Sequence, residues 1–345
     1  MSYTTIDKPT DYFNTKLYTG NGADDHAITG VNFQPDFVWI KTRSEANNHN
    51  LYDVIRGVNK PLKSNSTASE FTRTDAFKSF DSDGFTLDDD ATSDEVNKNT
   101  VTYASWNWLG ANGTASNSDG SITSTVSANT TAGFSIVSYT GTASTGATVG
   151  HGLGVKPDMI ITKARAIADN WGVYHKSLGA TKGLYLNTTN AQITSSAYYN
   201  NTEPTSTLVT LGDNEATNDN DTMIMYAFAE KKGYSKFGSY TGNGNANGTF
   251  VYTGMKPAFV MIKRTSGTQS WTILDNKRLG YNDANERLYP DEAYVEDSAS
   301  FDFLSNGFKP RITGNNLNGS GETYIYMAFA ENPFVTSTSI PCTAR

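Results

Sequence analysis

Three short stretches of the chain share one pattern of apolar and polar positions. Each begins near a proline, continues as a run of β-branched and aromatic residues, and ends in lysine: residues 34–41, 156–163 and 256–263. Proline cannot donate a ladder hydrogen bond and therefore suits the start of a strand. Because apolar residues occupy both parities of the run, we predict a strand that is covered on both faces.

We call these three stretches the boxes, and each predicted strand a box strand. Two further sequence features accompany each box. The triplet Tyr-Thr-Gly precedes the box proline by 17, 18 and 17 residues, starting at Tyr18, Tyr139 and Tyr240. A later aromatic strand follows the proline by 71, 71 and 72 residues when it is centred on Trp106, Phe228 and Phe329. Such constant spacing predicts a threefold internal repeat, with units of about 100 residues that each form a small domain.

The predicted fold class is all-β, with three tandem β-sandwich units of jelly-roll-like type, because no long stretch has helical periodicity. The sequence divides into an N-terminal arm (1–16), a first unit (17–110), a Ser/Thr/Gly-rich linker or edge strand (111–131), a second unit (132–231), a third unit (232–334) and a C-terminal tail (335–345). Between Phe80 and Phe85, Asp83-Gly84 predicts the turn of a hairpin, and Asn306-Gly307 echoes it.

The composition agrees with this fold class and argues against nucleic acid and membranes as partners. Charged residues make up 18% of the chain and aromatics 12%, alongside abundant Gly, Ser, Thr and Asn, which is typical of short strands joined by tight turns. A net charge of −8 without a Lys/Arg cluster argues against nucleic acid. No apolar run approaches transmembrane length, so we expect no membrane insertion. The polar start predicts no signal peptide.

Histidine and cysteine give little metal or redox chemistry. The single cysteine, Cys342, cannot form an intrachain disulfide. The four histidines lack the spacings of metal ligands. Since His26 and His151 occupy similar places in two units, we interpret them as structural hydrogen-bonding groups.

Two acidic clusters are candidate sites. Asp81, Asp83 and Asp88 lie close together in the sequence and could hold Ca²⁺, but the EF-hand pattern is absent and a solvated turn is the preferred interpretation. A second cluster spans residues 213–221. Glycoside hydrolysis needs only a spatial pair of carboxylates, and such a pair could come from Asp81, Asp83, Asp213 or Glu215. No other cofactor and no catalytic motif is indicated.

The large aromatic and basic residues of the repeat offer further candidates. Tryptophans at repeated strand positions are interpreted as core residues: Trp39, Trp106, Trp171 and Trp271. Trp108 stands where this alignment gives glutamate in the other units, so we predict an exposed aromatic at an interface or a glycan-stacking position. Lys41, Lys163 and Lys263 recur after the box and are either solvated strand ends or a threefold anion site.

The same motifs carry a resemblance to a known family. Residues 18–22, 30–41, 80–85 and 326–334 resemble a repeat domain found in marine tailed bacteriophages, and the similarity covers about residues 11–334. Proteins of that family are regarded as virion structural components: tail fibres, adhesins or head-surface proteins. The resemblance implies no catalytic residues.

The resulting functional expectation is a non-enzymatic bacteriophage virion protein made in the host cytoplasm. A tail fibre or tail adhesin that contacts the host surface is the leading interpretation. The alternatives are a capsid decoration or head-fibre protein, and a virion enzyme that degrades polysaccharide. Expected partners are other virion proteins, further copies of the chain, as a trimer, and a host-surface glycan or protein.

Overall fold

The computed structural model describes residues 3–279, 282 and 285–342, and its regular structure is almost entirely β. The described helical segments are one short α-helix, α1 (Glu215–Asn218), and a 3-10 turn, η1 (Pro9–Asp11). Every pairing between the named strands is antiparallel, and large sheets pack against smaller ones. The prediction of an all-β fold built from sandwiches is therefore confirmed.

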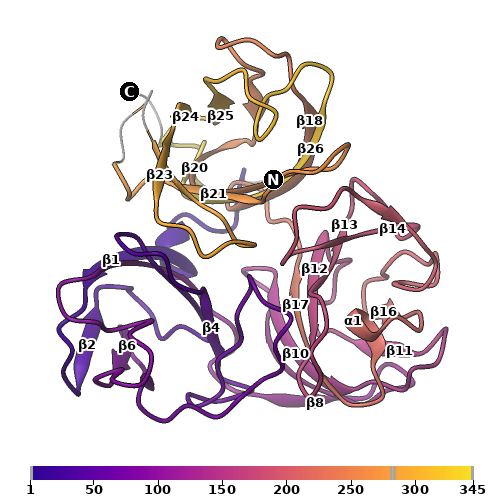
Figure 1. Cartoon of the computed structure of the whole chain (residues 1–345). Coiled ribbons are helices and arrows are strands. Elements are labelled where there is room, and N and C mark those ends of the chain that lie inside the picture. The colour runs from indigo at the N-terminus through magenta and orange to yellow at the C-terminus, as the bar shows by residue number, and fades with distance from the viewer. Residues whose placement is uncertain (1–2, 280–281, 283–284, 343–345) are drawn as a thin grey trace.

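Figure 1 shows three lobes around a common centre, which we call lobe 1 (residues 9–108), lobe 2 (115–228) and lobe 3 (235–333). Lobe 1 contains η1, β1 (Phe13–Thr19), β2 (His26–Thr29), β3 (Phe37–Thr42), β4 (Asn50–Asp53), β5 (Phe77–Asp81), β6 (Gly84–Leu87) and β7 (Thr102–Trp108). Lobe 2 contains β8 (Ala115–Asn117), β9 (Ser124–Asn129), β10 (Phe134–Thr140), β11 (Thr148–Gly150), β12 (Met159–Ala164), β13 (Gly172–His175), β14 (Lys182–Tyr185), β15 (Ile193–Thr194), β16 (Leu208–Thr210), α1 and β17 (Thr222–Phe228). Lobe 3 contains β18 (Ser235–Thr241), β19 (Val251–Tyr252), β20 (Met255–Arg264), β21 (Thr272–Asp275), β22 (Asn285–Leu288), β23 (Asp297–Ala299), β24 (Phe301–Leu304), β25 (Gly307–Pro310) and β26 (Thr323–Pro333).

The large sheets of the lobes share one strand order. Lobe 1 has β1-β7-β3-β4, lobe 3 has β18-β26-β20-β21-β22-β23, and lobe 2 has the matching β10-β17-β12-β13-β14 with further strands at both ends. A small sheet covers one face of each: β2-β6-β5, β11-β16 and β19-β25-β24. Apolar residues between the two sheets give each lobe its own core.

The opposite faces of the three large sheets meet in a common core at the centre of the molecule. Phe37 of lobe 1 stacks on Tyr226 of lobe 2 with ring centroids 4.4 Å apart, and Phe13 stacks on Phe329 of lobe 3 at 4.9 Å. Strands β3 and β12 are consequently buried at every position. The predicted coverage of the box strand on both faces is confirmed, with one face in its own lobe and the other in the common core.

The strand register corrects the alignment of the repeat. The residues opposite Phe37, Met159 and Phe259 are Trp108, Phe228 and Phe329. Trp108, rather than Trp106, is therefore the counterpart of the two phenylalanines. The segment between the box proline and this position is two residues longer in lobe 1 than in lobe 2. Constant spacing misplaced the tryptophan because Trp106 and Trp108 lie on the same face of one strand.

The structure bears on two expected boundaries: the end of the N-terminal arm and the segment 111–131. Strand β1 begins at Phe13, inside the predicted arm, and pairs along its whole length with β7. Residues 111–131 contain β8 and β9, which extend the large sheet of lobe 2, so the edge-strand alternative holds. In the tail, Val335 bridges Pro341, and residues 343–345 lie outside the described part of the chain.

The predicted Asp-Gly hairpin is confirmed, and the structure explains its glycine. Gly84 begins β6 directly after the two-residue turn, and Gly307 begins β25 in the same way. A Cβ atom at Gly84 would lie 2.0 Å from the Ile28 carbonyl oxygen, and one at Gly307 would lie 2.1 Å from that of Val251. Only glycine allows this close approach of the neighbouring strand.

Candidate functional site

One segment of each lobe crosses onto the next lobe. We call residues 63–70, 185–192 and 289–296 the joint segments. At their ends, the backbone N–H of Glu70 donates to Arg165 O at 2.7 Å, that of Gln192 to Thr265 O at 3.1 Å, and that of Glu296 to Arg43 O at 3.0 Å. The first contact joins lobe 1 to lobe 2, the second joins lobe 2 to lobe 3, and the third returns to lobe 1. The lobes therefore close into a ring.

An equivalent side chain in each joint segment bonds to its own lobe. Asn65 accepts a hydrogen bond from the backbone N–H of His49, and Asn187 accepts one from the N–H of Trp171. In lobe 3 the equivalent acceptor is Asp291, which receives the N–H of Trp271 at 2.9 Å. Burial raises the pKa of Asp291 to about 7, so the carboxyl resembles the two amides when it is protonated.

A ring nitrogen of the following lobe bonds to the start of each joint segment. Trp171 Nε1 donates to Lys63 O at 3.0 Å, and Trp271 Nε1 donates to Tyr185 O at 2.9 Å. His49, at the equivalent position of lobe 1, places Nε2 2.8 Å from Tyr289 O. Burial lowers the pKa of His49 well below its usual value, so the imidazole is neutral.

The box lysines are buried at these joints. Lys163 Nζ donates to Thr67 O of the incoming segment at 3.2 Å, and Lys263 Nζ donates to Thr189 O at 3.2 Å. Burial lowers the pKa of Lys163 and Lys263 to about 8, and that of Lys41 to about 7. The solvated-strand-end interpretation is wrong. The continuation of the strand is covered by the incoming segment, and the ammonium groups bind carbonyl oxygens.

Buried ion pairs lie under two of the joints. Asp53 bonds Arg56 Nε at 2.6 Å, and Asp275 bonds Arg278 Nε at 2.7 Å, with all four side chains fully buried. Each carboxylate also receives a donor from another lobe: the hydroxyl of Tyr226 reaches Asp53, and Trp106 Nε1 reaches Asp275. In lobe 2, His175 Nε2 lies 3.1 Å from the Tyr326 carbonyl instead. The polar groups of the centre thus link different lobes.

The predicted calcium candidates have structural partners. Asp83 accepts the backbone N–H groups of Gly30 and Asn32, which fixes the turn after β2. Asp81 accepts hydrogen bonds from the hydroxyls of Ser79 and Thr86, and Asp88 forms an ion pair with Lys78. Among the residues that the structure describes, no group of three or more His, Cys, Asp or Glu side chains could hold a metal ion.

The carboxylates named for glycoside hydrolysis lie in different lobes. Asp81 and Asp83 belong to the β5–β6 hairpin of lobe 1. Asp213, just before α1, and Glu215, its first residue, are exposed in lobe 2, and Figure 1 shows α1 and β6 in separate lobes. The fold does not bring the two pairs together.

Trp108 is not an exposed aromatic. Its side chain is 1% exposed, and its ring lies 5.2 Å from that of Phe37 and 5.7 Å from that of Phe329. The expectation of a glycan-stacking position is wrong, because the true register places Trp108 in the common core. The other strand tryptophans, Trp39, Trp106, Trp171 and Trp271, are core residues as predicted.

His26 and His151 have the structural bonds that the sequence suggested. His26 Nδ1 lies 2.6 Å from the Asn97 side-chain oxygen, and His151 Nε2 lies 3.3 Å from Thr205 O. Cys342 is a free, partly exposed thiol.

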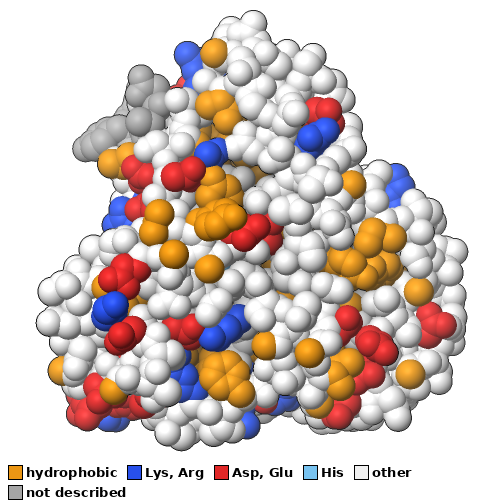
Figure 2. Space-filling view, in the orientation of Figure 1, with side chains coloured by type: hydrophobic (Ala, Val, Ile, Leu, Met, Phe, Trp, Pro, Cys, Tyr) orange, Lys and Arg blue, Asp and Glu red, His pale blue; other side chains and the backbone are white. Residues whose placement is uncertain are grey.

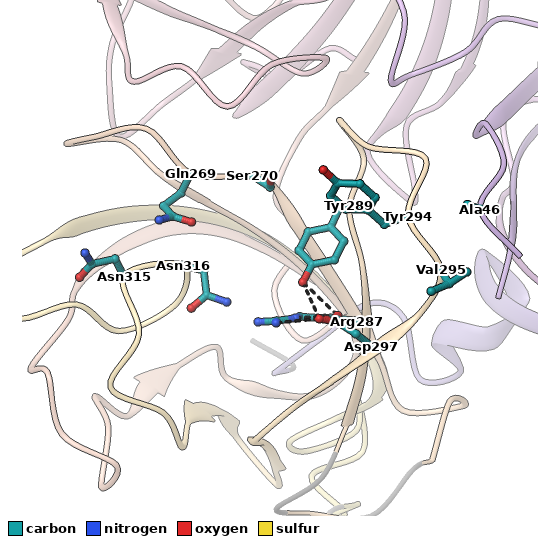
Figure 3. Close-up of a pocket in the computed structure, with 10 residues that line it drawn as sticks. All are labelled: Ala46, Gln269, Ser270, Arg287, Tyr289, Tyr294, Val295, Asp297, Asn315 and Asn316. Atoms are coloured by element: carbon teal, nitrogen blue, oxygen red, sulfur yellow. Dashed lines mark hydrogen bonds and ion pairs between the residues drawn. The ribbon is translucent and has the colours of Figure 1, made fainter. Parts of the chain in front are cut away.

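A pocket of about 640 Å³ lies where the third joint segment meets lobe 1. Figure 3 shows its lining: Ala46, Gln269, Ser270, Arg287, Tyr289, Tyr294, Val295, Asp297, Asn315 and Asn316. The sequence reasoning missed this site because its residues come from separate segments without a motif. One signal was present. The pair Tyr294-Val295 is replaced by the smaller Ala68-Ser69 and Asn190-Ala191 at the same distance from the anchoring Asn or Asp.

The fold and joints define a closed ring of β-sandwich lobes. Residues 8–333 match the family model described as Domain of unknown function (DUF7483), and the chain belongs to this family. No curated protein matches the chain. Among the described residues, no helix has the length and apolarity needed to cross a membrane.

Proposed function

We propose that this chain is a non-enzymatic structural protein of a bacteriophage particle, specifically a tail fibre or tail adhesin that is exposed and contacts the host surface. The observation that carries the proposal is the ring itself, in which ionisable side chains of the repeat bind the protein's own backbone across lobe boundaries.

The burial of these groups supports a structural role over a catalytic one. A catalytic acid, base or nucleophile must come within hydrogen-bond reach of its substrate. Lys163, Asp53 and Asp275 are fully buried and are bound by groups of neighbouring lobes. Such bonds hold the lobes in one arrangement, which suits a component that must keep its shape on a particle surface.

The molecular surface agrees with a role outside nucleic-acid binding. Figure 2 shows a face on which most atoms belong to the backbone or to uncharged side chains, with basic side chains scattered and often beside acidic ones. This face therefore offers no basic footprint for a phosphate backbone, in agreement with the net charge of −8. The resemblance of the repeated motifs to marine phage virion proteins supports the choice of a phage particle.

Mass spectrometry and electron cryomicroscopy of purified phage particles test this proposal. We expect the chain among the particle proteins and density for its ring on the tail. Density on the capsid lattice would instead favour the decoration alternative. Absence from the particles would contradict a virion role, and cleavage of host polysaccharide by the purified chain would contradict a non-enzymatic one. Self-association, proposed as a trimer, is measured by light scattering of the purified chain.

A further inference from the structure

We propose that the pocket between the third joint segment and lobe 1 binds a neutral oligosaccharide. The biological sense of this site, as a contact with a host glycan, rests on the proposed function. Binding itself is a property of the purified chain and is measured independently of the particle.

The site is assembled by the ring. Its wall is the β22–β23 hairpin with the joint segment between those strands, its other side comes from residues 269–270 and 315–316 of lobe 3, and Ala46 closes it from lobe 1. Its volume of about 640 Å³ lies within the range of roughly 300–1,000 Å³ that is typical of small-molecule sites. A ligand here would contact both partners of the third joint.

The aromatic part of the lining suits the apolar face of a sugar ring. Tyr294 is 58% exposed and Val295 is 43% exposed, although both are large apolar residues. The ring of Tyr289 meets that of Tyr294 edge to face, with centroids 6.1 Å apart. Tyrosine combines an apolar ring with a polar tip, so it can cover C–H groups and still bond a hydroxyl.

The polar part of the lining suits hydroxyl groups. The side-chain amides of Gln269, Asn315 and Asn316 have no hydrogen-bond partner among the residues that the structure describes, and Figure 3 shows them grouped on one side of the pocket. Each amide offers both donors and an acceptor. A ligand with many hydroxyls can satisfy both functions, whereas an apolar ligand would leave them unpaired.

The charges of the lining favour a neutral ligand over a phosphate or sulfate. Arg287 and Asp297 form a bidentate ion pair with both N–O distances at 2.8 Å, and the Tyr289 hydroxyl donates to Asp297 at 2.9 Å. The guanidinium also lies over the Tyr289 ring, 5.3 Å from its centroid. The cation is therefore already neutralised, and the wall is held in place before a ligand binds.

Comparison with lobe 2 shows which residues of the pocket are not needed to form a joint. Residues Gly183 and Ile193 of lobe 2 pair across β14 and β15 as Arg287 and Asp297 pair across β22 and β23. A joint consequently forms without the ion pair. Tyr185 stands at the position of Tyr289 in lobe 2, so that tyrosine belongs to the scaffold. The Arg287–Asp297 ion pair and the exposed pair Tyr294-Val295 are the features of the lining that distinguish the third joint.

Saturation-transfer NMR with the purified full-length chain tests the site. The probes are four neutral trisaccharides, with glucose α1,4-linked, glucose β1,3-linked, mannose α1,2-linked or galactose β1,4-linked, together with glucose 6-phosphate and a sulfated galactose disaccharide. We expect transfer to at least one neutral trisaccharide and a loss of affinity of about tenfold or more in Tyr294→Ala. Such a loss corresponds to roughly 1.4 kcal/mol.

Phe71→Ala is the matched control, because Phe71 is another partly exposed aromatic, directly after the first joint segment and outside the pocket. This variant should bind as the unmodified chain does, and thermal melting should show both variants folded. Equal binding by Tyr294→Ala would overturn the proposal, as would transfer to the charged sugars alone or to none of the probes. Failure here leaves the virion role standing, whereas absence from particles leaves the site standing.

Discussion

At the scale of single residues, burial decides the protonation of the groups at the joints. Lys163 and Lys263 have carbonyl oxygens as partners and no carboxylate within ion-pair distance among the described residues, so desolvation lowers the pKa of each ammonium. Asp291 experiences the opposite shift because burial disfavours its anion. The strength of the joints should therefore vary with pH in a way that single substitutions can isolate.

The substitution Asp291→Asn should remove one pH dependence. A raised pKa means that the contribution of Asp291 to stability is present below its unfolded pKa of about 4 and is lost as pH rises through about 7. The variant should therefore melt at a higher temperature than the unmodified chain at about pH 8 and show a smaller advantage at about pH 5. A tenfold change in the protonation equilibrium corresponds to roughly 1.4 kcal/mol, which sets the scale of the effect. Differential scanning calorimetry measures this.

Asn65→Asp is the reciprocal control, since Asn65 has the same role in lobe 1. It should introduce a loss of stability as pH rises. Parallel melting curves for Asp291→Asn and the unmodified chain at both pH values would contradict the buried-acid interpretation.

The substitution Lys163→Met should act in a higher pH range. The lowered pKa means that the stability contributed by neutral Lys163 is present above about pH 10 and is lost as pH falls through about 8. The unmodified chain should gain stability between about pH 7 and about pH 9, and the variant should gain less. Urea denaturation at the two pH values measures the difference. Lys156→Met, at an exposed ion pair, should leave the slope unchanged.

At the scale of elements, the joint segments are the parts that make the molecule one body. The anchoring residue lies five positions before the N–H donor in every case, from Asn65 to Glu70, from Asn187 to Gln192 and from Asp291 to Glu296. Glu70 and Glu296, at the ends of two joint segments, also form an ion pair with an arginine of the next lobe, whereas Gln192 at the end of the third segment is uncharged. The backbone hydrogen bond is thus common to all three joints, and the ion pairs strengthen two of them.

The substitution Trp271→Phe should loosen the second joint. It keeps most of the buried ring but leaves Tyr185 O without its 2.9 Å donor. An unsatisfied buried polar group costs about 1–3 kcal/mol. Hydrogen–deuterium exchange should become faster in residues 185–192 and remain unchanged in residues 63–70, where Trp171 is intact. Faster exchange in both segments, or in neither, would contradict a local role for the indole bond.

Local features of this fold could be predicted from sequence, and long-range ones could not. The box strands and the hairpin at Gly84 depend on neighbouring residues, so their pattern was sufficient. The register at Trp108 was misjudged because Trp106 offers a second aromatic on the same strand face. The joints escaped prediction because backbone carbonyls and amides make their defining bonds, and every residue type has these groups. The pocket forms at a joint, so it could not be predicted from the sequence either.

At the scale of the whole molecule, each large sheet is shared between two cores. One face belongs to its own lobe and the other to the common core, so a lobe without its neighbours would expose a wide aromatic surface to water. Burial of that surface is a main driving force for folding. The ring should therefore unfold as one cooperative unit, and damage at its centre should reach every lobe.

Hydrogen–deuterium exchange of Trp108→Ala tests this shared core most directly. Removing a buried tryptophan costs about 3–5 kcal/mol, and Trp108 contacts aromatic rings of all three lobes. If the core is shared, exchange should accelerate together in β7, β17 and β26. Acceleration confined to β7, with lobes 2 and 3 as protected as in the unmodified chain, would contradict the common core and with it the closed ring.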